Sequence, residues 1–139
     1  MPLKQLCVAV AAALLAATDA ESASSIFDFG LGLSEATVTV EGKTFRIYTN
    51  KRGRDSILLQ AAIKDSLGGM NPAAWPLADW RRAAETLVAP VGCGIEDVAA
   101  VTRIGASWEA TYVCPPGVDL RALIREQSAD LKQGAPLHR

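Results

Sequence analysis

Cysteine and histidine are the residue types in this sequence whose spacing bears most directly on chemistry. The chain holds three cysteines and one histidine. Redox-active cysteines usually occur as a Cys-x-x-Cys pair, which the sequence does not contain, and a zinc site needs about four ligands. Cys93, Cys114 and His138 do not supply that set. We therefore predict a structural disulfide between Cys93 and Cys114, closing a loop of about 22 residues, and no metal site.

Groups suited to acid–base catalysis are sparse. A nucleophile–base mechanism most often uses histidine as the base, and His138 lies next to the C-terminal residue. A carboxylate mechanism needs two acidic side chains at a defined separation. Glu96 and Asp97 are adjacent, which places them on opposite faces of a strand. We expect Glu109 to be a solvated sheet residue or the partner of Arg103 across a hairpin. We expect no enzymatic activity and no cofactor.

A basic loop is the most unusual polar feature of the chain. Lys51, Arg52 and Arg54 follow an expected strand that carries Arg46 and an exposed Tyr48. Such a group can hold a carboxylate, a phosphate or an acidic partner surface, because arginine binds these anions through two parallel hydrogen bonds. The alternative is a solvated turn whose charges keep a sheet edge soluble.

Trp75 is the tryptophan most open to a role in binding. It lies in a loop between Ala74 and Pro76, whereas Trp80 and Trp108 fall on apolar faces of expected elements. An exposed tryptophan is a frequent contact residue at interfaces. The alternative is a cap over the edge of the core, and we favour the cap.

An apolar N-terminal run, Leu6–Ala17, follows Lys4 and precedes small and polar residues. This pattern is typical of a secretory signal peptide, with cleavage after Ala20 or, as second choice, after Ser22. The run is shorter than the roughly 20 residues of a membrane-spanning helix, so an uncleaved anchor is a minor alternative. A cytosolic protein with a disordered apolar N-terminus is another. We predict a signal peptide at 1–20 and a periplasmic or secreted protein of a bacterial envelope, with no transmembrane segment after its removal.

Length and charge limit the remaining classes. The formal net charge of −1 argues against binding nucleic acid through a basic excess. The part of the chain after the signal is long enough for one domain. We divide it into a flexible N-terminal arm at 21–35, a single domain at 36–133 and a C-terminal tail at 134–139.

Hydrophobic periodicity predicts the elements of that domain. Alternating apolar residues predict strands at 36–41, 44–48, 97–104 and 108–114. Residues 56–63 fit a third strand or a short helix, and we favour the strand. Apolar stripes at helical spacing predict helices at 76–89 and 120–132, the second capped by Asp119. We therefore predict an α+β fold: a small antiparallel sheet of four to five strands, from two hairpins, with two helices on one face, in the order ββ(β)αββα.

Three classes of function agree with these features. The first is a non-catalytic binding or accessory module of the envelope, whose partner is another envelope protein or an anionic ligand. The second is a structural subunit of an envelope assembly, joined through sheet edges, with the arm Ser24–Leu33 adding a strand to a neighbour. The third is a secreted enzyme that depends on carboxylates alone.

Overall fold

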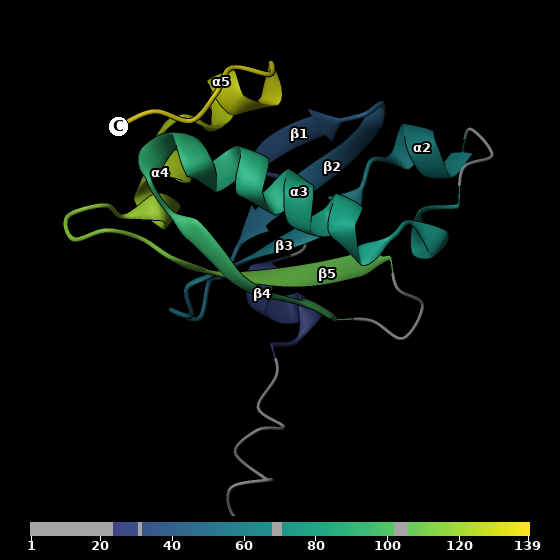
Figure 1. The fold of residues 1–139 in the computed structure, drawn as a ribbon, viewed down its shortest axis with the longest axis horizontal. Helices are drawn as coiled ribbons and strands as arrows, with labels where there is room; N and C mark the ends of the chain where they lie inside the picture. Colours follow the sequence, from purple (N-terminus) through teal and green to yellow (C-terminus); the bar gives the residue numbers. More distant parts are fainter. Residues whose placement is uncertain (1–23, 31, 68–70, 102–105) are drawn as a thin grey trace, which may run out of the picture.

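Five strands form one antiparallel sheet in the computed structural model, which describes residues 24–30, 32–67, 71–101 and 106–139 (Figure 1). The strand order is β1-β2-β3-β5-β4, so β1 and β4 are the outer strands. The strands are β1 (Ala36–Val40), β2 (Lys43–Thr49), β3 (Ser56–Ala61), β4 (Gly94–Ala100) and β5 (Ser107–Val113). The predicted α+β class is confirmed, and the third strand is present.

The first hairpin follows from its sequence. Glu41 and Gly42 connect β1 to β2, and both have positive φ, 52° and 78°. Two such residues form the tight turn whose twist suits a hairpin. The register pairs Val40 with Lys43 on either side of this turn. Residues therefore alternate strictly along β2, which decides which side chains share a face.

The second hairpin differs in detail from the prediction. β4 begins at Gly94 rather than Asp97, and its register with β5 shifts between Ile95 and Asp97. Glu96 and Asp97 are both exposed. The expected end of the strand and its turn, residues 102–105, lie outside the described residues.

Helices cover one face of the sheet. The long helix α3 (Leu77–Val88) crosses that face in Figure 1, and it is one residue shorter at each end than the predicted helix at 76–89. The short helices α2 (Ile63–Leu67), η2 (Pro72–Ala74) and η3 (Ala89–Val91) lie in the connections before and after it. The core that α3 forms with the strands is centred on its own buried stripe: Trp80, Ala83, Ala84, Leu87 and Val88.

The expected last helix is two helices, α4 (Leu120–Glu126) and α5 (Ser128–Lys132). The Asp119 side chain caps α4 by accepting the Ala122 N–H at 3.2 Å, as predicted. The break falls at Gln127, whose φ and ψ are −104° and 9°. The Gln127 amide bonds both the N–H and the carbonyl of His138. The break between α4 and α5 therefore coincides with a contact between Gln127 and the C-terminal tail.

The C-terminal tail at 134–139 is docked on the domain. Leu137 is 2% exposed and belongs to the core. Arg139 donates a hydrogen bond to the Val91 carbonyl at 3.2 Å. The His138 side chain is nevertheless exposed.

The second face of the sheet is covered by part of the expected flexible arm. Residues Ile26–Phe29 form a 3₁₀ helix, η1, which lies on the side of the sheet opposite to α3 (Figure 1). Phe29 is 1% exposed and packs against Tyr48 and Leu58. The segment 24–30 is thus part of the domain, whereas the predicted signal peptide and residues 21–23 lie outside the described residues.

The predicted disulfide joins Cys93 to Cys114, with Cα atoms 4.2 Å apart. The register that pairs Gly94 with Val113 places the two cysteines opposite each other at the end of the β4–β5 ladder. The bond therefore ties the end of η3 to the end of β5.

Removing this disulfide is expected to lower stability by about 3 kcal/mol, the chain-entropy contribution of a loop of this length. The double variant Cys93→Ala, Cys114→Ala tests this by urea denaturation followed by circular dichroism. Reductant should lower the midpoint of the wild-type protein and leave that of the variant unchanged. Equal midpoints for oxidised wild type and variant would contradict the expectation.

Candidate binding site

The basic loop is engaged with acidic groups of its own chain. Lys51 Nζ lies 2.8 Å from Glu35 Oε1, and Arg52 Nε lies 3.5 Å from Asp28 Oδ1. Arg54 Nε lies 3.7 Å from a carboxylate oxygen of Glu109. We predicted that these three cations could bind an external anion. They instead join the basic loop to the N-terminal segment and to the sheet.

Hydrogen bonds extend these contacts to the start of the described chain. The Lys51 N–H donates to the Asp28 carbonyl at 2.7 Å. Asn50 donates from its side-chain amide to the Ser24 hydroxyl at 3.4 Å. Together with the burial of Phe29, these bonds hold η1 on the second face of the sheet.

Glu35 is the acidic group of this region whose pKa is displaced. Burial by itself raises the pKa of Glu35, but hydrogen bonds from Lys51 and Thr49 outweigh it and lower the pKa below the usual value of 4.5. Thr49 donates from both its N–H, at 2.7 Å, and its hydroxyl, at 2.6 Å. The ionised carboxylate is therefore the form that the folded protein favours.

Glu109 belongs to a buried polar network, so the expectation of a solvated side chain was wrong. It is 6% exposed, and Ser56 donates a hydrogen bond to its Oε2 at 2.6 Å. Asn50 donates in turn to the Ser56 hydroxyl at 3.2 Å. Arg103, its other expected partner, lies outside the described residues. Glu109 is thus a link between the sheet and the basic loop.

A cavity of about 210 Å³ opens on the second face beside η1. It brings together Arg46 and Tyr48 from β2 and Gln60 from β3; its other walls are Ile26, Leu58, Gly30 and Gly32. Of the six residues that the sequence suggested for a binding surface, Arg46 and Tyr48 line this cavity. Both lie on the second face because the neighbouring Phe45 and Ile47 belong to the helix-covered core.

Neutral groups position Arg46. Its Nε donates to the Ala61 carbonyl and its Nη2 to Gln60 Oε1, each at 3.3 Å. Gln60 donates in turn to the Ser107 hydroxyl at 3.0 Å. The register places these three side chains directly opposite one another across β2, β3 and β5. A cross-strand ladder therefore orients the guanidinium.

The charge of Arg46 has no carboxylate partner among the described residues. Two other cations are half-buried in the described part of the chain, Lys43 and Arg121. Lys43 lies 2.6 Å from Asp79, and Arg121 lies 3.9 Å from Asp55. Arg46 therefore differs from both in having only neutral partners among the described residues.

Tyr48 is buried rather than exposed as expected. It is 7% exposed because η1 covers its ring. Its hydroxyl makes no hydrogen bond with any residue that the structure describes. Tyr48 thus lines the cavity, and its hydroxyl is a hydrogen-bond donor without an acceptor among the described residues.

Trp75 lies on the other side of the sheet. It is half-buried, and its ring centroid is 5.3 Å from that of Phe45 and 5.7 Å from that of Trp80. Lys43 Nζ lies 5.6 Å above the same ring. These contacts agree with the cap over the core edge and place Trp75 away from the Arg46 cavity.

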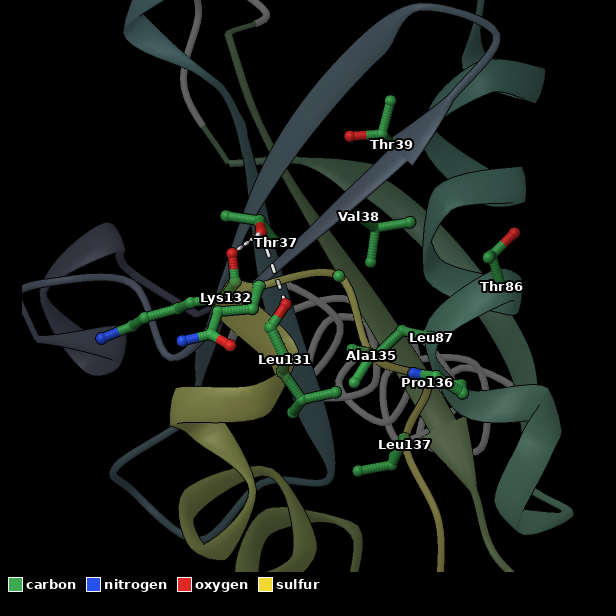
Figure 2. Close-up of a pocket in the computed structure, with 12 residues that line it drawn as sticks. Thr37, Val38, Thr39, Thr86, Leu87, Leu131, Lys132, Ala135, Pro136 and Leu137 are labelled. Carbon is green, nitrogen blue, oxygen red and sulfur yellow. Dashed lines mark hydrogen bonds between the residues drawn. The ribbon is translucent and has the colours of Figure 1, made fainter.

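A groove of about 380 Å³ lies along the outer strand β1, and no sequence pattern predicted it. Figure 2 shows it bounded by β1, the end of α3 and the C-terminal segment. Thr37 donates from its hydroxyl toward the Lys132 carbonyl at 3.4 Å, which attaches the end of α5 to the strand. The groove depends on the docked tail, and no local pattern in the sequence indicated that docking.

A third hollow lies between α4 and the end of β5, beside the disulfide. Arg121 donates there to the Arg54 carbonyl at 2.9 Å and lies near Asp55. Burial raises the pKa of Tyr112, and the charge of Asp55 adds to the shift. Since Asp55 and Asp119 line this hollow, its cation faces acidic groups of the same chain.

Within the described ranges, no group of three or more histidine, cysteine or acidic side chains is placed to hold a metal ion. None of the helices described is long and apolar enough to span a membrane. Comparison with known proteins finds no family model, no curated protein and no solved structure that matches the chain.

The Glu35 site predicts a specific acid sensitivity. Because the pKa of Glu35 is lowered on folding, its ionised form stabilises the protein above pH 4.5, and this contribution is lost as the pH falls through the lower folded value. Glu35→Gln is expected to cost about 1–2 kcal/mol at neutral pH, the scale of hydrogen bonds to a charged group. The difference from wild type should shrink on acidification.

Urea denaturation between neutral pH and pH 3 measures this difference. Thr49→Val, which removes one donor and keeps the carboxylate, should weaken the acid dependence only in part. A constant gap between wild type and Glu35→Gln across the whole range would refute the assignment.

Proposed function

We propose that this protein is an exported, non-catalytic binding module of the cell envelope, and that its binding site is the Arg46 cavity. The observation that carries the proposal is Arg46, a half-buried residue that lines a cavity and has no carboxylate partner among the described residues. A buried charge is costly unless a partner balances it. An anionic group brought by a ligand or partner protein supplies that balance.

Export is supported by the disulfide together with the apolar leader. Disulfides persist in oxidising compartments and are rare in the cytosol. Cys93 and Cys114 are joined, and the leader Leu6–Ala17 has the pattern of a signal peptide. Both features agree with a periplasmic or secreted location, because a signal peptide directs export and the disulfide persists in an oxidising compartment.

Binding without catalysis is supported by the surroundings of the candidate groups. Glu109, the buried acid, is occupied by Ser56 and Arg54, and the His138 side chain is exposed at the chain end. The Arg46 cavity offers hydrogen-bond donors and apolar walls. Such a lining suits recognition, because it holds an anion without a group to attack it.

A structural subunit joined through a sheet edge is the second candidate, favoured by the outer strand β1. The alternation set by the Val40–Lys43 pair directs the backbone groups of Thr37 and Thr39 away from β2. The groove in Figure 2 runs along this edge. The arm suggested as a donated strand is less suited, since residues 24–30 pack on their own sheet.

Capture of partners from the native envelope tests the proposal and separates the two candidates. The bait is the oxidised protein as wild type, Arg46→Gln, or the control Arg125→Gln, an exposed arginine on α4. Loss of a charge-assisted hydrogen bond is expected to reduce the captured partner about tenfold or more for Arg46→Gln only. A partner retained by Arg46→Gln but lost with Thr39→Pro would favour the edge-joined subunit instead.

Charge reversal in the basic loop is a poor substitute for this test. Arg52 faces Asp28, and Arg54 faces the buried Glu109. Glutamate at either position would set two carboxylates against each other and perturb the fold itself. Circular dichroism of each bait should therefore show an unchanged fold before capture is compared.

A further inference from the structure

The Arg46 cavity combines one positive charge with a neutral, partly apolar lining. Arginine has five N–H groups, and those of Arg46 make two hydrogen bonds within the chain, to Ala61 and Gln60. The remaining donors and the Tyr48 hydroxyl belong to residues that line the same cavity. Leu58 and Ile26 supply apolar surface beside them.

We infer that this cavity binds a monocarboxylate with a short apolar body, an inference that rests on the proposed binding function and names the ligand class of the same site. The carboxylate accepts from the free edge of the Arg46 guanidinium, a planar pairing that arginine makes with two parallel hydrogen bonds. The Tyr48 hydroxyl donates to the same group. The apolar body lies against Leu58 and Ile26.

Charge favours a carboxylate over a phosphate. A phosphate monoester carries a charge of about −1.5 to −2 at neutral pH, whereas a carboxylate carries one. The described lining holds a single cation, Arg46, because Lys51, Arg52 and Arg54 face acids of the chain outside this lining. One guanidinium neutralises one carboxylate.

Size favours a small ligand. Pockets that enclose drug-sized molecules measure about 300–1,000 Å³. The cavity of about 210 Å³ is smaller than this range, so it holds a short group rather than a whole nucleotide or lipid. A free branched-chain acid fits this space, as does the carboxylate end of a polypeptide, and both present the same chemistry.

Gln60 acts as a positioning residue for this site. It accepts from Arg46 and donates to Ser107, so its amide fixes the plane of the guanidinium from the adjacent strand. Gly30 also lines the cavity, and it ends η1 at φ +70°, a conformation that L side chains rarely adopt. The site is thus formed from β2, from β3 and from the docked segment.

Titration of the oxidised full chain by ¹H–¹⁵N NMR tests the inference. The probes are isovalerate as the free acid and N-acetyl-leucine as the mimic of a polypeptide end, with isovaleramide, N-acetyl-leucinamide and inorganic phosphate for comparison. We expect saturable shifts of the Gly30, Gly32 and Arg46 signals with one or both carboxylates, and much smaller shifts with the amides and phosphate. The stronger carboxylate identifies the source of the group.

Variants assign the contacts. Arg46→Gln should weaken the carboxylate at least tenfold, and Tyr48→Phe, which deletes only a hydroxyl, about fivefold. Arg46→Lys keeps the charge but loses the planar fork, so it should bind more weakly than wild type. The matched control Arg125→Gln should titrate like wild type.

Equal shifts for acids and amides, phosphate binding as tight as the acids, or binding unaffected by Arg46→Gln would overturn the inference. This failure is distinct from failure of the proposed function. Carboxylate binding without capture of any envelope partner would sustain the ligand class and overturn the partner-binding role. Capture of a partner that depends on Arg46, combined with no NMR response to either acid, would sustain the partner-binding role and overturn the ligand class.

Discussion

The structure depends on the burial of its central strands on both faces. Alternation along β2 sends Phe45 and Ile47 into the helix-covered core and Arg46 and Tyr48 to the opposite face. An antiparallel sheet often leaves one such face to water. Here Phe29 of η1 covers it instead, packed on Tyr48 and Leu58. This docking places Arg46, a charged residue of β2, beside a cavity that opens on the second face.

Charge pairing around η1 follows from the same docking. Asp28 of η1 and Glu35, the residue before β1, meet Arg52 and Lys51 of the basic loop. The loop cations are thereby used to hold the segment, and Arg46 is left with neutral partners in the described chain. An arginine kept half-buried in this way retains binding capacity for an anion, which connects the packing of the N-terminal segment to the proposed function.

Local sequence patterns predicted much of the fold. Apolar residues recur every two residues in the strands and about every 3.6 residues in α3, and both periods can be recognised in the sequence. The pairing of Cys93 with Cys114 followed from the scarcity of alternatives and is confirmed. Contacts between distant segments were the part that could not be predicted. Buried Glu109 accepts a hydrogen bond from Ser56 across the sheet, and the last helix breaks where Gln127 meets the tail. The candidate site likewise needed the register that aligns Arg46 with Gln60.

Amide hydrogen exchange at Lys51 tests the central claim most directly. This N–H lies in an exposed loop, and its partner is the Asp28 carbonyl of η1. If the segment covers the second face, Lys51 should exchange at least about tenfold more slowly than Gly53 of the same loop. Phe29→Ala should abolish that protection, and Phe27→Ala, at a side chain that is 69% exposed, should preserve it. Exchange of Lys51 at the rate of Gly53 in the wild-type protein would contradict the account.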